Sequence, residues 1–106
     1  MQDNPVVIAD SDGVIRFWSR GAETRFGYSA AQSLGRTLDL IVPAEYRQAH
    51  WNGFRRAVAS GAAGAEGRVS PFPVLKADGE ILEFPGRLTL VRQGSGQVIA
   101  VMVVFG

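Results

Sequence analysis

Short apolar runs and turn signals alternate at the start of the chain. Residues 6–9 form an apolar, mostly β-branched run, residues 10–13 form a polar cluster that ends in glycine, and residues 14–18 resume the apolar pattern. Two such runs around a glycine-containing loop are typical of a β-hairpin. We therefore expect the chain to begin with two antiparallel strands.

Three short helical segments are predicted next, each bounded by a capping residue or a stop signal. Ser19 and Gly27 bound the first, Ser29 and Gly35 bound the second, and Pro43 ends the third. Helices of one or two turns are not stable alone. We therefore expect these segments to pack on a sheet.

Residues 43–61 predict one long amphipathic helix that carries the only histidine of the chain. At the helical spacing, the apolar and small side chains fall on one arc of roughly 160°. The arc contains Gly53, Tyr46, Ala57, His50, Phe54, Val58 and Trp51, with His50 near its middle. Because Gly53 and Ala57 are so small, this arc leaves room beside the imidazole for a flat molecule.

The rest of the chain predicts three strands. Pro71 and Pro73 restrict the strand over residues 68–75 to the edge of a sheet. A hairpin turn at residues 77–80 leads to an alternating strand over residues 82–90, and a second turn leads to residues 98–105. This last stretch is apolar on both faces, which indicates a central strand whose second face is covered by another element or another chain.

The order of these elements predicts an α+β fold. We expect a five-stranded antiparallel sheet with the short helices and the one long helix packed on one face. The length and the absence of repeats indicate a single domain over residues 1–106.

Composition narrows the possible chemistry. A net charge of +1 gives no sign of a nucleic-acid partner, and the absence of cysteine excludes disulfides, thiolate metal sites and flavin–thiol photochemistry. No apolar run approaches the roughly 20 residues that span a bilayer, and the N-terminus lacks a signal-peptide pattern, so we expect a cytoplasmic domain without a membrane partner. The chain shows no nucleophile–base pair, no paired-carboxylate motif and no phosphate-binding glycine loop, so we expect no catalysis.

Several local motifs resemble the PAS domain superfamily over essentially the whole chain. They are the sequences DGVI at 12–15, GAE at 21–23, FGY at 26–28, Gly35, IVP at 41–43 and KADG at 76–79. The resemblance implies a sensor and dimerisation module. Such modules hold haem, flavin or a small metabolite between the helices and the sheet, and many hold nothing.

A narrower resemblance concerns the long helix. Pro43, Tyr46, Arg47 and His50 match the pattern Pro-x-x-Tyr-Arg-x-x-His of haem-binding PAS domains in rhizobial oxygen-sensor kinases. This resemblance implies that His50 is the axial ligand of the iron of haem b. It also implies that Arg56, six residues later, lies near a haem propionate.

The same resemblance suggests residues for the other wall of the pocket. Gly86 and Leu88 fall where that family has two apolar residues that crowd the gas-binding side. The arginine that reports bound oxygen in the family aligns with Ser70, and Arg68, two residues earlier on the same strand face, is the candidate to replace it. The thioether of Met102 is a candidate sixth ligand.

These inferences lead to the hypothesis of a haem b site that senses a diatomic gas or a redox state. The predicted site comprises His50 as the metal ligand, with Tyr46, Gly53, Phe54, Ala57, Arg56, Arg68, Ser70, Gly86, Leu88 and Met102. Two alternatives remain open: a flavin or small metabolite that hydrogen-bonds to His50, and a filled core that serves only for dimerisation. In the second alternative, His50 would be a buried histidine that is hydrogen-bonded to a backbone carbonyl.

We also expect a homodimer, or flanking elements that cover the sheet and that this sequence does not include. Only about five residues precede the first strand, which is too few for a helix that covers the outer face of the sheet. An apolar face without a cover implies association. Ligand binding would change this pairing and so act on an output domain that lies outside this sequence.

Overall fold

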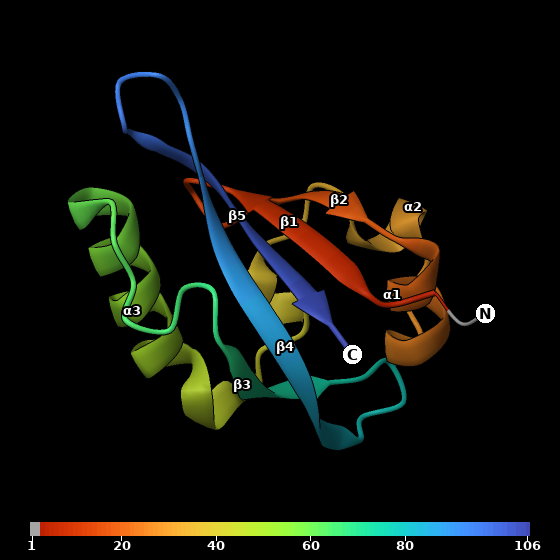
Figure 1. Ribbon diagram of the computed structural model, residues 1–106. Helices are drawn as coiled ribbons and strands as arrows, with labels where there is room; N and C mark the ends of the chain where they lie inside the picture. The colour runs from red at the N-terminus through yellow and green to blue at the C-terminus, as the bar shows by residue number, and fades with distance from the viewer. Residues whose placement is uncertain (1–2) are drawn as a thin grey trace.

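A computed structural model describes residues 3–106 of the chain (Figure 1). The elements follow one another as β1 (Val6–Asp10), β2 (Ile15–Trp18), α1 (Arg20–Phe26), α2 (Ala30–Ser33), the 3₁₀ turns η1 (Leu38–Leu40) and η2 (Ala44–Tyr46), α3 (Arg47–Ser60), β3 (Val69–Leu75), β4 (Ile81–Arg92) and β5 (Val98–Phe105). The predicted α+β fold and the order of its elements are confirmed.

The five strands form one antiparallel sheet in the order β2-β1-β5-β4-β3. The strand that is apolar on both faces, β5, is central, and β3 with its two prolines lies at an edge, as the sequence predicts. Val7 on β1, Val103 on β5 and Leu88 on β4 are register partners, so they form one row across the sheet. This row faces the helices.

The short helices form where their caps predict them. The Ser19 hydroxyl accepts from the Ala22 N–H at 3.2 Å, and Gly27 ends α1 with φ of 92°. Ser29 and Gln32 form a reciprocal capping box at α2. The third segment is a 3₁₀ turn, η1, not an α-helix.

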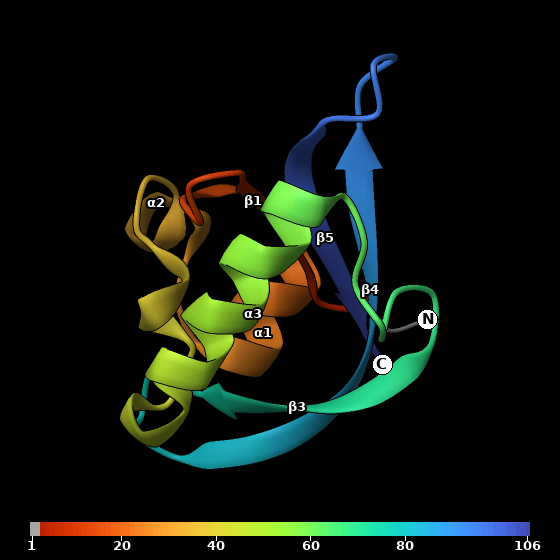
Figure 2. The ribbon, with the colours of Figure 1, turned by 90° about the vertical axis from the view of Figure 1, so that its left-hand side faces the viewer.

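All helices lie on one side of the sheet (Figures 1 and 2). Beneath α1, large side chains fill the space: the ring of Phe26 is fully buried and meets the rings of Phe84 and Phe105, each with 5.1 Å between centroids. Beneath α3 the packing is thinner, since Phe54 and the small Ala57 are the only buried residues of that helix. The core is therefore dense under α1 and hollow under α3.

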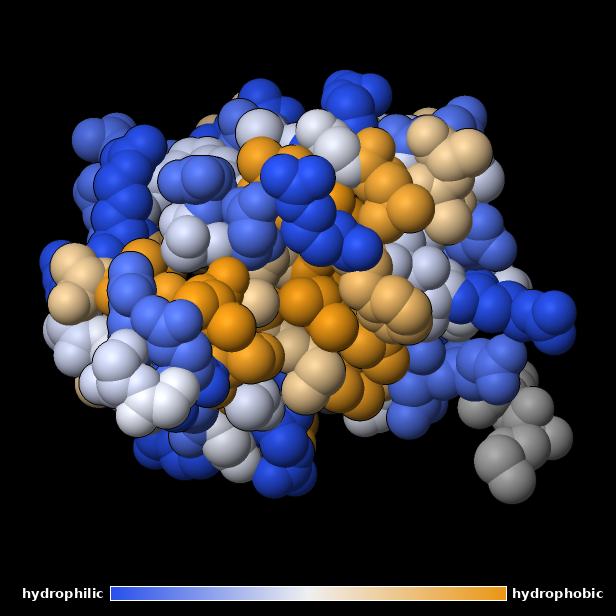
Figure 3. Space-filling view, turned by 90° about the horizontal axis from the view of Figure 1, so that it is seen from above, coloured by the Kyte–Doolittle hydropathy of each residue, from blue (hydrophilic) through white to orange (hydrophobic). Residues whose placement is uncertain are grey.

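The outer face of the sheet carries apolar side chains. Ile8, Met102 and Thr89 are register partners on β1, β5 and β4 and point away from the helices, because their neighbours in each strand point inward. All three are only partly buried. Figure 3 looks at the molecule from the top of Figure 1, at right angles to that view, and shows hydrophobic side chains gathered across the middle between hydrophilic borders. Across residues 3–106, no helix is both long and apolar enough to cross a membrane.

Candidate functional site: a cavity between helix α3 and the sheet

A cavity of about 580 Å³ lies between α3 and the inner face of the sheet. Its lining from the α3 side is Tyr46, Ala49, His50, Gly53, Phe54, Arg56 and Ala57; from the sheet Val7, Ala9, Phe72, Pro73, Val74, Leu88, Leu90, Val101, Val103 and Phe105; and from the connecting segments Leu38, Ile41, Val42, Ala62, Ala63, Gly64 and Ala65. The lining is mostly apolar, and the volume falls in the range of about 300–1,000 Å³ that small-molecule sites occupy.

Small residues on α3 create this hollow. Gly53 has no described atom within 4 Å of the position that a Cβ would occupy, and Ala49 and Ala57 project only methyl groups. A helix that carried leucine at these positions would fill the space against the sheet. The small-residue wall predicted beside His50 is therefore present.

His50 places an imidazole in the wall of the cavity. Its Nδ1 atom is buried and has no hydrogen-bond partner among residues 3–106. The ring packs against Trp51 with 4.7 Å between centroids and against Phe54 with 5.9 Å. His50 thus does not make the carbonyl contact that an ordinary buried histidine would make.

The imidazole is held in its neutral form. Burial lowers the pKa of His50 below its usual value of 6.5, and the charge of Asp39 opposes the shift only in part. A neutral imidazole keeps one nitrogen lone pair free, which is the form that accepts a hydrogen bond or binds a metal ion.

The start of α3 is fixed by polar contacts and by one close approach. The Trp51 indole N–H donates to the Asp39 carboxylate at 2.8 Å, and the Arg47 guanidinium donates to the carbonyls of Val42 and Asp39 at 3.1 and 3.2 Å. The Trp51 ring packs directly over Gly13, where a Cβ would overlap it. These contacts hold the helix in place although little of it is packed on the sheet.

Seven of the predicted site residues line the cavity, namely His50, Tyr46, Gly53, Phe54, Ala57, Arg56 and Leu88. All but Leu88 belong to the long helix or to the turn before it. Arg56 is exposed, so it stands at the rim. Helical periodicity placed five of them correctly, namely Tyr46, His50, Gly53, Phe54 and Ala57, whereas Arg56 was predicted only from the resemblance.

Four predicted residues do not line the cavity. Met102 is on the outer face of β5 and so lies on the wrong side of the sheet for a sixth ligand. Arg68 precedes β3 rather than sharing its face with Ser70, and its guanidinium donates to the Gly64 carbonyl at 2.6 Å. Gly86 and Ser70 are paired on the inner face, but the Phe72 ring covers Gly86, with atoms 2.8 and 3.0 Å from the position of a Cβ.

Most of the sheet wall and the segment over residues 62–65 were not predicted from the sequence. Val101, Val103 and Phe105 face the cavity from β5, but a strand that is apolar on both faces gives no signal of which face is inner. Residues 62–65 have side chains too small to suggest burial. Trp51, by contrast, is not part of the lining.

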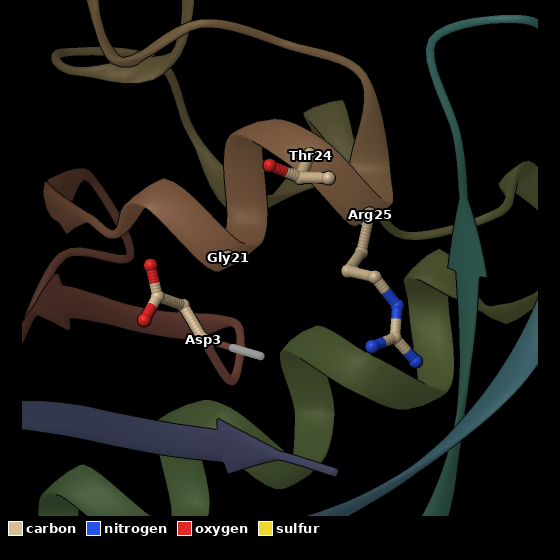
Figure 4. Close-up of a pocket in the computed structure, with 4 residues that line it drawn as sticks. All are labelled: Asp3, Gly21, Thr24 and Arg25. Atoms are coloured by element: carbon tan, nitrogen blue, oxygen red, sulfur yellow. The ribbon is translucent and has the colours of Figure 1, made fainter. Parts of the chain in front are cut away.

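A second, open depression lies where α1 meets the N-terminal segment, lined by Asp3, Gly21, Thr24 and Arg25 (Figure 4). The backbone of Asp3 and Asn4 packs so closely on Gly21 that a Cβ would lie 2.5–2.6 Å from it. The Asp3 and Arg25 side chains approach the depression from different sides. Its four described lining residues include no large apolar side chain, so it lacks the apolar wall that is typical of a ligand site.

The residues that could hold a metal ion are few. Across the described part of the chain, no group of three or more His, Cys, Asp or Glu side chains comes together. His50 alone supplies one ligand. This arrangement suits a metal that brings its other ligands with it, as the iron of haem does.

The model of the PAS fold family matches residues 2–105 of the chain. The chain belongs to the PAS family. The resemblance of the whole chain to PAS domains is thus confirmed, and with it the interpretation of the fold as a sensory module. This PAS domain is also 34% identical, over 92 residues, to an uncharacterized protein of Azorhizobium caulinodans. The match covers 86% of the chain but only 12% of that protein.

Solved structures of PAS domains have the same fold. The PAS domain of a protein from Colwellia psychrerythraea is similar with a TM-score of 0.80 at 20% identity, covering 97% of this chain and 84% of that one. The PAS domain of the quorum-sensing receptor RpfR of Cronobacter turicensis, in complex with C12:0, gives 0.77 at 16% identity over 99% and 93% of the chains. A light-oxygen-voltage domain studied with a flavin analogue gives 0.74 at 22% identity over 97% and 76%. At these identities the likeness shows the fold alone, and the haem-binding subgroup is not shown.

Proposed function

We propose that this PAS domain is a sensor that binds an apolar small molecule or cofactor in the cavity beneath α3, with His50 as the polar group that contacts it. One observation carries the proposal: a neutral imidazole with an unpartnered, buried Nδ1 stands in the wall of an apolar cavity of about 580 Å³. The buried, unpaired Nδ1 costs folding free energy that an apolar side chain would avoid, which suggests that the imidazole is present for what its other nitrogen, Nε2, can bind.

Haem b is the first candidate ligand. The Nε2 atom of His50 is not enclosed as Nδ1 is, so it is the nitrogen available to an iron. Gly53 and Ala57 leave space beside it for a flat ring, and Arg56 at the rim suits a propionate. When bound, a haem supplies an iron whose second axial position takes a diatomic gas.

Two features limit what such a site can do. With Nε2 as the ligand, the proton lies on Nδ1, which lacks the acceptor that ligating histidines ordinarily have. The sheet contributes only apolar side chains to the lining, since Arg68 and Ser70 are absent from it. The described cavity therefore offers no side-chain donor on the sheet side, and it favours a gas that binds without a hydrogen bond.

An amphiphilic carboxylate is the second candidate, and a flavin or other small metabolite falls in the same group. The apolar lining with an arginine at its rim suits an acyl chain with a charged end, and a similar PAS structure is a complex with C12:0. His50 would then donate or accept a hydrogen bond. A third possibility is a domain that binds no ligand and serves only for dimerisation.

The partner proposed for the outer face of the sheet is a second copy of this chain. The half-buried apolar row that includes Ile8 and Met102 suits an isologous contact. Signalling would then pass through this contact to an output domain.

The experiment that tests the proposal is a spectroscopic titration of the apoprotein with haemin, in wild type, His50→Ala and Arg68→Ala. We expect a Soret band in the wild type and in Arg68→Ala, which alters a residue outside the cavity. The His50→Ala protein should bind at least about tenfold more weakly, a difference of about 1.4 kcal/mol.

Three other results would change the assignment. A Soret band of equal position and affinity in His50→Ala would exclude His50 as the required ligand. Absence of haemin binding combined with calorimetric binding of C12:0 or a flavin would favour the second candidate. Binding of none of these would leave the dimerisation module.

A further inference from the structure

Residues 61–67 form a short strap that joins α3 to β3 and closes one side of the cavity. Ala62, Ala63, Gly64 and Ala65 line the cavity with backbone and methyl groups. Of these, only Ala63 packs on the apolar cluster beneath α3. The strap is therefore held in place by something other than apolar side chains.

The strap lies along β4 in the region that β3 does not reach. The pairing of β3 with β4 begins at Val69 and Arg87, so the edge of β4 beyond Arg87 is free of a strand partner. There the Gly67 N–H donates to the Leu88 carbonyl at 2.9 Å, and the Leu90 N–H donates to the Glu66 carboxylate at 3.0 Å. Glu66 thus takes the place of the carbonyl of a neighbouring strand.

Arg92, at the end of β4, ties both ends of the strap. Its guanidinium donates to the two carboxylate oxygens of Glu66 at 2.7 and 3.1 Å and to the Gly61 carbonyl at 2.8 and 3.2 Å. The contact with Glu66 is bidentate, the geometry that gives the strongest guanidinium–carboxylate pairs. The pair lowers the pKa of Glu66, with a smaller contribution from the Leu90 N–H.

The other walls of the cavity are built differently. Helix α3 and the strands are held by continuous ladders of backbone hydrogen bonds. The strap depends on side-chain contacts, and the side chains of Glu66 and Arg92 are 24% and 37% exposed to solvent. Local opening takes place where few buried apolar contacts hold a segment. By this criterion, we expect the strap to open more easily than the other walls.

We propose that the strap is a gate that widens the way into the cavity when it opens, and that the Glu66–Arg92 pair is the latch that sets how often this happens. The role of the gate in ligand exchange rests on the proposed function. The opening itself is a property of the ligand-free protein, so it is measured without any ligand.

The first test is amide hydrogen exchange of the ligand-free protein in wild type, Glu66→Gln and Arg92→Gln. Glu80→Gln is the matched control, because Glu80 forms an exposed ion pair with Lys76 in the β3–β4 turn, away from the cavity. We expect exchange at Gly67 and Leu90 to rise at least threefold in both latch variants. Exchange at Val101 on β5 should stay unchanged, as should all exchange in Glu80→Gln. Equal exchange at Gly67 in all four proteins would overturn the proposal.

The second test measures stopped-flow binding of haemin and of the fluorescent apolar probe 8-anilinonaphthalene-1-sulfonate to the same proteins. Loss of the latch should raise the association and dissociation rate constants by the same factor and leave the dissociation constant within about twofold, because it changes the barrier between the free and bound states and not the difference between their free energies. Faster exchange with unchanged rate constants would show that the ligand enters elsewhere and would overturn the gate. A wild type that binds neither probe would count against the proposed function, whereas hydrogen exchange would still decide whether the latch controls opening.

Discussion

The imidazole of His50 lies among apolar side chains in the wall of the cavity beneath α3. Its Nδ1 atom is buried without a partner among the described residues, and such an atom typically costs about 1–3 kcal/mol. A group retained at a cost to folding is typical of functional sites. At the scale of a single residue, His50 thus has the character of a binding group rather than a packing group.

The pH dependence of stability should report this residue. Burial lowers the pKa of His50 below 6.5, so the unfolded state takes up a proton more readily than the folded state. We expect the free energy of unfolding to be constant above about pH 7.5 and to decline as the pH falls from about 6.5 toward the lowered pKa. Urea denaturation at several pH values between about 5.5 and 7.5 measures this decline in the free energy of unfolding.

His50→Leu is the matching variant. It should remove the decline over this pH range and leave the ligand-free domain at least as stable as the wild type at neutral pH. The carboxylates Asp10 and Glu66, whose pKa values are lowered, titrate well below this range. A His50→Leu protein less stable by more than about 1 kcal/mol would instead give the imidazole a structural role.

The position of a single site residue could be predicted from the sequence where the repeat of one helix determines the side on which its side chain lies. His50, Gly53 and Ala57 fall on one face because a helix repeats every 3.6 residues. Arg68 and Met102 were misplaced because a strand assigns opposite faces to neighbouring residues. For Arg68, β3 starts one residue later than predicted; for Met102, β5 is apolar on both faces.

At the scale of elements, the small residues of α3 leave the cavity open, although glycine in mid-helix makes the helix less stable. Gly53 is in mid-helix, where glycine is less favourable than alanine by about 0.5–1 kcal/mol, and its surroundings within the described chain are empty. We expect Gly53→Ala to stabilise the domain by that amount and to weaken haemin binding several-fold, because the methyl group enters the cavity. Thermal unfolding and the haemin titration measure the two effects.

Gly79→Ala is the control for the gain in stability that we expect from Gly53→Ala. Gly79 also has empty surroundings, but its φ of +89° is unfavourable for residues with a Cβ, so this variant should lose about 1–2 kcal/mol. A Gly53→Ala protein that gains stability yet binds haemin as tightly as wild type would place the ligand away from this wall.

The elements themselves could largely be predicted. Capping residues marked the short helices, and the prolines marked the edge strand. The boundaries were less certain, because Pro43 starts a 3₁₀ turn, η2, and α3 begins only at Arg47. The strap could not be predicted at all, since the contact of Glu66 with Arg92 joins residues 26 positions apart and no local pattern reports it.

At the scale of the whole molecule, the proposed ligand site and the proposed dimer contact lie on opposite faces of the sheet. We expect wild-type protein to be dimeric in sedimentation velocity at micromolar concentration and Met102→Glu to be monomeric with an unchanged circular dichroism spectrum. The glutamate would place a charge in the middle of the half-buried apolar row. A wild type that remains monomeric over a hundredfold range of concentration would show that the outer face does not pair with a second copy.

The central claim, that His50 contacts the ligand held beneath α3, is tested most directly by the nitrogen spectrum of the imidazole. The chain has one histidine, so ¹⁵N-histidine labelling gives resonances that belong to His50 alone. On titration with zinc protoporphyrin, a diamagnetic analogue of haem, or with C12:0, we expect the Nε2 resonance to move in step with binding measured by fluorescence or calorimetry. Nitrogen resonances that stay in place while either probe binds at full occupancy would contradict the account.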